Sequence, residues 1–177
     1  MKRLRRKIGD VFVASLNEGK KYFQYLVSDN TQLGGDVIRV FKKKYSADEN
    51  PELEDVVNGE VDFHTHVFLN VGNKEGAWEK RGNVPFGGQV NVIFRSDSYM
   101  GSKEEILGGE FKRTFAEAEE RKKSANWCVW RPNEPMQFVG RLEGENTNSE
   151  SGGVLPPYAV LERMETGRYP GKWGQEQ

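Results

Sequence analysis

The chain has 177 residues, with 26 Lys or Arg against 27 Asp or Glu and a net charge of −1. A length in the range of ~100–200 residues fits one domain with a substantial core, so we expect residues 1–177 to form a single domain. The balanced charge excludes a uniformly basic nucleic-acid-binding protein, and ten Phe, six Tyr and four Trp exclude a disordered chain.

The first residues and the cysteine content bear on the compartment. Basic residues between Lys2 and Lys7 are soon followed by Asp10, without the ~7–15 apolar residues that a secretion signal requires. No run reaches the ~18–20 apolar residues of a membrane helix. The single cysteine, Cys128, makes no internal disulfide, and its apolar neighbours predict a buried structural thiol. We therefore expect a cytoplasmic protein that does not contact a membrane.

The first 45 residues predict three strands joined by short turns. Alternating residues predict a strand over 11–15, and a turn at 17–20 leads into a second strand over 22–27. A break at 28–30 precedes a β-branched and aromatic strand over 36–41. Such a meander is typical of a small barrel or a strongly bent sheet.

A short helix and two further strands are predicted before residue 95. Asn50 as N-cap and Pro51 at the first helical position predict a helix that Gly59 ends. A strand over 61–71, a loop-rich stretch over 72–88 and a strand over 89–94 follow. On the strand over 61–71, one face carries Phe63, Thr65, Val67 and Leu69, and the other carries Asp62, His64, His66 and Phe68.

The second half predicts helices and a closing pair of strands. Capping boxes at Ser102 and Thr114 predict two helices, of which the second ends near Lys123. Strands over 127–130 and 136–139 flank a Pro-rich turn.

The C-terminal part predicts a loop, a helix and a docked tail. Residues 144–153 are rich in Gly, Asn, Ser and Thr and contain no apolar side chain, so they predict a mobile loop. A helix follows Pro157 and ends at Gly167, and the aromatic residues of 168–173 are predicted to dock on the core.

Together these elements predict an α+β protein that is mainly antiparallel β. We expect an SH3-like small barrel or a strongly bent sheet of about seven strands, with two or three peripheral helices. Residues 1–95 form the β-rich barrel part, and residues 96–177 supply a helix, the closing strands and the C-terminal tail.

Charged residues are segregated along the chain. Residues 1–44 carry eleven Lys or Arg and four Asp or Glu, for +7, whereas residues 45–73 carry seven acids and no Lys or Arg, for −7. The remainder has fifteen bases and sixteen acids. Two explanations are open. In the structural one, the two blocks pack beside each other or lie on solvated faces. In the functional one, they form a charged patch that steers a partner.

His64 and His66 are the only histidines, and their spacing places both on one face of a strand beside Asp62. Such a pair can bind zinc or iron, but the sequence nominates no third ligand beyond Asp62, and a polar strand face is the alternative. No phosphate-binding loop, dinucleotide fingerprint or serine elbow is present. We predict a protein that is not an enzyme and has no cofactor or metal, with a metal-dependent enzyme at His64 and His66 as an alternative.

One basic arrangement is a candidate for nucleic-acid binding. It combines the basic N-terminus with a lysine run beside Phe41 and Tyr45, and its charged members are Arg5, Arg6, Lys42, Lys43 and Lys44. Lysine runs at strand ends also protect a sheet edge against aggregation. A nucleic-acid-binding barrel therefore stays open as a second alternative.

The first hairpin resembles a known family. The resemblance rests on Lys7-Ile8-Gly9-Asp10-Val11-Phe12, on Leu16, on the turn Gly19-Lys20-Lys21-Tyr22 and on the strand over 23–27. These residues resemble the opening of the bacterial family called immunity protein 26, over residues 7–45. The resemblance implies a predominantly β protein of a polymorphic toxin system, in which a cytoplasmic immunity protein binds a cognate toxin and blocks it. It transfers no binding residues, because immunity surfaces differ with each toxin.

The leading prediction is a non-catalytic immunity protein whose partner is a cognate toxin rather than nucleic acid. Many toxins of such systems are basic nucleases, so the resemblance implies that an acidic surface would imitate their substrate. The predicted contacts are Asp48, Glu49, Glu52, Glu54 and Asp55.

Overall fold

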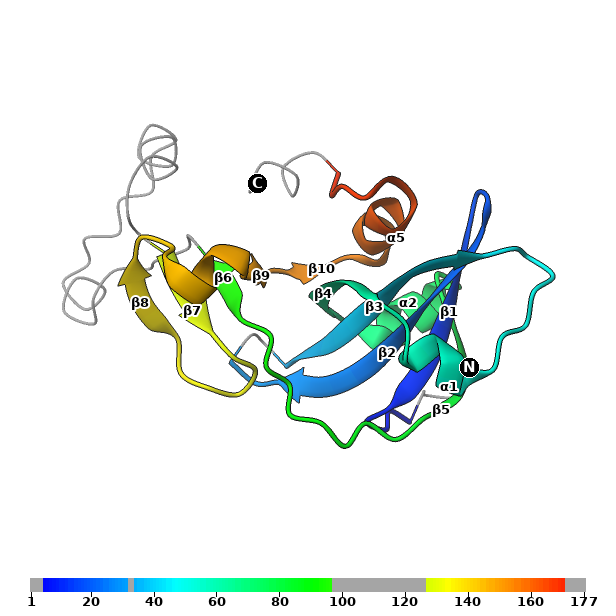
Figure 1. The fold of residues 1–177 in the computed structure, drawn as a ribbon, viewed down its shortest axis with the longest axis horizontal. Helices are drawn as coiled ribbons and strands as arrows, with labels where there is room; N and C mark the ends of the chain where they lie inside the picture. Colours follow the sequence, from blue (N-terminus) through cyan, green and yellow to red (C-terminus); the bar gives the residue numbers. More distant parts are fainter. Residues whose placement is uncertain (1–4, 32–33, 97–126, 171–177) are drawn as a thin grey trace.

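The computed structural model describes residues 5–31, 34–96 and 127–170, which form two β-sheets with short helices beside them (Figure 1). The larger sheet has six strands in the order β10-β4-β3-β2-β1-β5. Its strands are β1 (Asp10–Leu16), β2 (Gly19–Asp29), β3 (Gly35–Tyr45), β4 (Val61–Val67), β5 (Glu79–Asn83) and β10 (Val154–Leu155). Neighbouring strands are antiparallel, except that β10 runs parallel to β4.

The long strands β2 and β3 give the larger sheet its bend. Their pairing shifts register between Lys21 and Phe23, and again between Tyr25 and Val27. Such irregularities bend a strand and increase its twist. Within the described ranges the sheet stays open, with β10 and β5 as its two edges. The predicted α+β fold is therefore confirmed as a strongly bent sheet and not as a closed barrel.

Two glycines shape the first hairpin. Gly9 has a φ of +89°, and a Cβ at this position would lie 2.3 Å from the carbonyl oxygen of Val84. Gly19 has a φ of +91°, and a Cβ there would lie 2.2 Å from the carbonyl oxygen of Tyr45. Positive φ and close backbone approach both favour glycine. Gly9 thus lets the chain turn before the fully buried Asp10, which begins β1.

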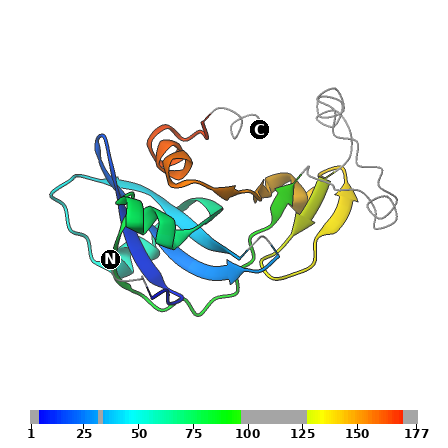
Figure 2. The same cartoon turned by 180° about the vertical axis from the view of Figure 1, so that it is seen from behind.

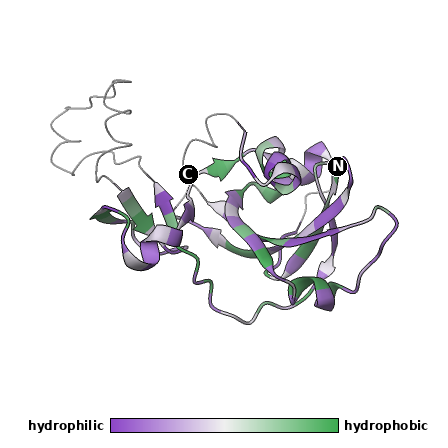
Figure 3. Ribbon diagram, turned by 45° about the horizontal axis from the view of Figure 1, so that its top comes forward, coloured by the Kyte–Doolittle hydropathy of each residue, from purple (hydrophilic) through white to green (hydrophobic). Residues whose placement is uncertain are grey.

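The two faces of the six-stranded sheet are covered by different elements (Figures 1 and 2). One face packs beside α2 (Leu69–Glu75) and α5 (Pro157–Thr166), around a core that includes Phe12, Phe23, Ile38, Val40, Phe63, Trp78, Val160 and Met164. At one end of the other face, α1 (Leu53–Val57) contributes Val56 to a cluster with Val11, Val13, Tyr22, Phe41 and Tyr45. Because both faces are covered, consecutive residues are buried along much of β1, β2 and β3, and these strands carry hydrophobic as well as hydrophilic residues (Figure 3).

The four-stranded sheet covers the other end of that second face. Its order is β8-β7-β6-β9, with β6 (Phe94–Ser96), β7 (Trp127–Trp130), β8 (Gln137–Gly140) and β9 (Glu150–Ser151), and the 3₁₀ helix η1 (Gly144–Asn148) precedes β9. Phe94 and Trp130 pack with Leu26 and Val37 of the larger sheet. This cluster joins the two sheets through apolar contacts, whereas the organisation of the whole chain as one domain stays a prediction.

Two helices differ from the sequence predictions. The first begins at Leu53 and not at Pro51, with Glu52 as its N-cap. The strand predicted to run to residue 71 ends at Val67, and α2 follows it. Tertiary contacts override the alternating pattern here, because the indole of Trp78 donates a hydrogen bond to the carbonyl oxygen of Leu69 and lies over Gly72.

The second half confirms some predictions and corrects others. The strands over 127–130 and 136–139 correspond to β7 and β8, and α5 ends at Gly167 with a φ of +77°. The strand predicted over 89–94 is wrong except at its end, since β6 begins at Phe94. The predicted mobile loop over 144–153 is also wrong. It contains η1 and β9, which lies beside β6 because the N–H of Glu150 donates to the carbonyl oxygen of Ile93.

The remaining predictions concern the tail and the segment after β6. Tyr169 is buried and packs edge-on against Phe63, so the tail docks by this aromatic residue. Trp173 and the helices predicted from Ser102 and Thr114 lie outside the described residues. The described ranges contain ten strands where about seven were predicted. The two-residue strands β9 and β10 are too short to show an alternating pattern.

Candidate partner-binding surface

The acidic residues predicted to bind a partner lie together at one end of the larger sheet. Asp48 and Glu49 belong to the segment that follows β3, Glu52 caps α1, and Glu54 and Asp55 form its first turn. All five side chains are exposed. The structure therefore presents the five residues on one continuous segment, which we call the acidic segment (residues 48–55).

Buried contacts hold the acidic segment against the sheet. Val56 is 1% exposed and packs with the aromatic rings of Tyr22 and Tyr45. The ammonium of Lys20 donates to the carbonyl oxygen of Ala47 at 3.0 Å and to Oδ1 of Asn50 at 3.5 Å. Because both ends of the segment are anchored, its carboxylates are displayed by a supported backbone.

Part of the charge segregation is neutralised inside the fold. Three ion pairs join the basic and acidic blocks: Lys21–Asp62 at 2.8 Å, Lys42–Glu60 at 2.8 Å and Lys43–Glu49 at 3.9 Å. In the described part of the chain, Asp48, Glu52, Glu54 and Asp55 have no cationic side chain within ion-pair distance. The uncompensated charge of the acidic block is therefore concentrated on the acidic segment.

The basic residues of the nucleic-acid alternative are mostly engaged in ion pairs. Besides the pairs of Lys42 and Lys43, Lys44 lies 3.5 Å from Glu165, and Arg6 pairs with the buried Asp36. Arg5 is exposed. Four of the five cations thus lie within ion-pair distance of a carboxylate, which reduces the positive charge that they offer to phosphates.

His64 and His66 share a strand face, as predicted, but have different environments. Nε2 of His66 lies 2.8 Å from Oδ2 of Asp29, with both side chains fully buried. His64 lines a cavity, and burial, with a further contribution from Arg39, lowers its pKa to about 4. The described residues contain no group of three or more His, Cys, Asp or Glu that could hold a metal ion. Asp62, the suggested third ligand, pairs with Lys21 instead.

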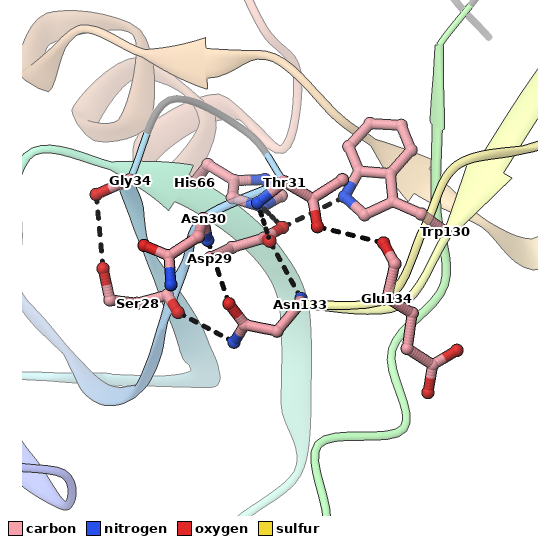
Figure 4. Close-up of polar contacts among 9 residues, drawn as sticks. All are labelled: Ser28, Asp29, Asn30, Thr31, Gly34, His66, Trp130, Asn133 and Glu134. Carbon is pink, nitrogen blue, oxygen red and sulfur yellow. Dashed lines mark hydrogen bonds and ion pairs between the residues drawn. The ribbon is translucent and has the colours of Figure 1, made fainter.

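Asp29 is the centre of a buried polar junction between the two sheets (Figure 4). Its Oδ2 accepts hydrogen bonds from the indole of Trp130 at 3.0 Å and from His66. Its Oδ1 accepts the backbone N–H groups of Thr31 and Asn133, each at 2.9 Å. Burial acts to raise the pKa of Asp29, but these hydrogen bonds together lower it, so the carboxylate stays charged.

The same junction fastens the turn after β7 to the turn after β2. Asn133 has a φ of +65° and donates from Nδ2 to the carbonyl oxygen of Ser28. Its Oδ1 accepts the N–H of Asn30, and the hydroxyl of Thr31 donates to the carbonyl oxygen of Glu134. Sequence reasoning identified both stretches as turns and did not predict that they meet.

A polar row crosses the centre of the larger sheet on the face that carries α1 and the smaller sheet. Gln24 of β2, Arg39 of β3 and His64 of β4 are register partners. Oε1 of Gln24 accepts hydrogen bonds from Nε and Nη2 of Arg39 at 3.0 and 2.6 Å. The guanidinium carbon also lies 5.2 and 5.1 Å from the ring centroids of Phe41 and Phe86. Arg39 is thereby held in one orientation, and burial lowers its pKa.

This row opens into a cavity of about 540 Å³ between the two sheets. Arg39, His64 and Glu150 contribute its charged and titratable groups, together with Glu145 at η1. Oε1 of Glu150 accepts the backbone N–H of His64 at 2.8 Å, and burial raises the pKa of this carboxyl. Sequence reasoning assigned no role to Gln24, Arg39 or Glu150, because their partners are distant in the chain.

Cys128 is buried, and burial raises the pKa of its thiol. These properties confirm the prediction of a structural cysteine.

The comparison with protein families shows to which family the chain belongs. The model of the family described as immunity protein 26 matches residues 7–105, more than half of the sequence. The chain belongs to the immunity protein 26 family. The match confirms the resemblance seen in the first hairpin and extends it beyond residue 45. No curated protein and no solved structure matches the chain.

Membership of the immunity protein 26 family bears on the competing interpretations. The family is non-catalytic, so the protein is not an enzyme and the metal-enzyme interpretation of His64 and His66 is dropped. The family also implies a role in neutralising a toxin. The matched range includes the acidic segment, Arg39 and His64, whereas Trp130 and Glu150 lie after it. In the described part of the chain, no helix is long and apolar enough to span a membrane.

Proposed function

We propose that this member of the immunity protein 26 family binds one cognate bacterial toxin in the cytoplasm and neutralises it by covering its surface. The observation that carries the proposal is the acidic segment. Asp48, Glu52, Glu54 and Asp55 lie within eight residues, all exposed, and lack cationic partners in the described ranges. Family membership supplies the kind of partner, and the segment supplies a surface that a basic toxin would recognise.

The segment has properties that suit recognition of a cationic surface. Its backbone is anchored through Val56 and Lys20, so little order has to be created on binding. Clustered charges of one sign raise the association rate with an oppositely charged partner and disfavour partners of the same sign. A nuclease whose active site attracts phosphates would meet carboxylates in their place.

The test is the interaction with the toxin module encoded beside this gene. We expect the two proteins to co-purify, and we expect the immunity protein to rescue cells that express the toxin module. Reversing Glu49, Glu52, Glu54 and Asp55 to Lys should weaken binding at least about tenfold, chiefly through slower association.

A matched comparison separates local contact from net charge. The variant Glu54→Lys with Asp55→Lys changes the charge by the same amount as Glu75→Lys with Glu162→Lys, and all four residues are exposed. We expect the first variant to slow association and the second to leave it nearly unchanged. Equal affinities for both variants and the unaltered protein would show that the acidic segment is not the contact.

A further inference from the structure

We propose that the cavity beside Arg39 and His64 receives a single carboxylate side chain of the toxin. This inference rests on the proposed function, and it adds a second, oppositely charged contact to the one made by the acidic segment. It assigns an anchoring role to the polar row, which neither the family nor the sequence patterns identified.

The charge balance of the cavity leaves one cation without a counter-ion. Glu145 lies 3.1 Å from Arg131, and Glu150 lies 3.6 Å from Arg163. Both cavity carboxylates therefore have an arginine partner of their own. Arg39 has no carboxylate within ion-pair distance in the described part of the chain, and its polar contacts are with Gln24 and the carbonyl oxygen of Val57.

Arg39 and His64 each keep a hydrogen-bond donor group that has no acceptor among the described residues. The hydrogen bonds of Arg39 use Nε and Nη2, which leaves the Nη1 amino group without an acceptor in the described residues. The ring of His64 likewise makes no hydrogen bond there. As register partners on adjacent antiparallel strands, the two side chains start about 5 Å apart and share one face. One carboxylate can accept from both.

The position of Arg39 is set before any partner binds. Gln24 accepts hydrogen bonds from two of its N–H groups, and its guanidinium lies over the rings of Phe41 and Phe86. A charged hydrogen bond to a guanidinium that is already oriented loses little conformational entropy on binding. A half-buried arginine without a counter-ion also gains more from a carboxylate than an exposed one does, because water screens it less.

The surroundings favour one carboxylate over a polyanion. Glu145 and Glu150 line the same cavity, and they would repel a chain of phosphates. A nucleic acid needs several cations along its backbone, whereas the cavity offers one uncompensated cation. A volume of about 540 Å³ is ample for the end of an Asp or Glu side chain.

Arg39 lines the cavity and also contacts α1, which carries two residues of the acidic segment. Nη2 of Arg39 lies 3.4 Å from the carbonyl oxygen of Val57, the last residue of α1, and Glu54 and Asp55 lie on the same short helix. A toxin must then present a basic patch next to a projecting acid. This alternation of charge rejects partners that are basic throughout, and so contributes to specificity for one toxin.

The experiment compares Arg39→Gln with Arg141→Gln, because Arg141 is exposed and makes no hydrogen bond or ion pair within the described ranges. Binding to the neighbouring toxin module is measured for each variant, after thermal melting has shown that it is folded. We expect Arg39→Gln to weaken binding by about tenfold to a hundredfold, mainly through faster dissociation, and Arg141→Gln to change it less than about twofold. Unchanged binding of folded Arg39→Gln would overturn the inference.

Two further measurements identify the partner group. In double-mutant cycles between Arg39→Gln and Asp→Asn or Glu→Gln variants of the toxin, one toxin acid should show a coupling of at least about tenfold. In the unaltered complex, the nearby carboxylate should raise the pKa of His64 above its value of about 4 in the free protein. This second readout needs no variant to fold.

The outcomes distinguish this inference from the proposed function. A complex that forms normally but shows no coupled toxin acid and no shift at His64 would overturn the anchoring role alone. Failure of the unaltered protein to bind the neighbouring toxin module would overturn both.

Discussion

Replacing Asp29 with asparagine tests whether the buried carboxylate fastens the two sheets together. The change keeps the size of the side chain but replaces one of two acceptor oxygens with an NH₂ group, which only donates. Four donors converge on Asp29, two at each oxygen. Whichever way the new amide is turned, two of these groups therefore face an NH₂ group in place of an acceptor oxygen.

The expected loss follows from the number and type of hydrogen bonds. A hydrogen bond to a charged group contributes about 1.5–3 kcal/mol, and a buried donor left unpaired adds a penalty of its own. If the NH₂ group faces His66 and Trp130, His66 can change its tautomer and accept, but the indole N–H cannot. We therefore expect Asp29→Asn to lower the free energy of unfolding by about 3–5 kcal/mol.

The assay is urea unfolding followed by tryptophan fluorescence, since Trp130 belongs to the junction. Trp130→Phe removes one donor and keeps the carboxylate, so its loss should be smaller, about 1–3 kcal/mol. Asp48→Asn serves as the control, because that side chain is exposed and its replacement should cost no more than about 0.5 kcal/mol. A loss below about 1 kcal/mol for Asp29→Asn would refute the reasoning.

Two further predictions concern packing and pH. Gly72→Ala places a Cβ 2.0 Å from the ring of Trp78 and should cost about 1–3 kcal/mol in urea unfolding, whereas Gly87→Ala, which meets open space, should be nearly neutral. Burial holds the pKa of His64 at about 4 against 6.5 in the unfolded chain, so stability should fall by about 3 kcal/mol between pH 6.5 and 4. The raised pKa of Glu150 acts in the opposite direction, and Arg39 keeps its charge throughout. The difference between the unaltered protein and His64→Gln isolates the contribution, and parallel pH curves would contradict it.

The elements that sequence reasoning predicted correctly are those encoded by neighbouring residues. The hairpin of β1 and β2 follows from alternating residues around a turn with Gly19, and α5 follows from Pro157 at its start and Gly167 at its end. The acidic segment is equally visible in the sequence, because exposed charges need no distant partner. Its continuity and exposure are confirmed, whereas its binding role stays a prediction.

The elements that were missed depend on contacts between residues far apart in the chain. Trp130 donates to Asp29 across 101 residues, and Glu150 accepts from His64 across 86. The helix α2 replaces a predicted strand where Trp78 packs over Gly72. No local pattern identifies such pairs, since a hydrogen bond depends on positions that the whole fold creates.

The sequence by itself therefore determined the strand-rich meander, the segregation of charge and, through the first hairpin, the immunity protein 26 family. The tertiary structure decided which charges remain available to a partner. It pairs five cations of the first block with acids, namely Arg6, Lys21, Lys42, Lys43 and Lys44, and it leaves Arg39 oriented at a cavity without a counter-ion. The physical reason is that a charge is neutralised by what lies within a few ångströms of it, and that neighbourhood is set by strand register and sheet packing.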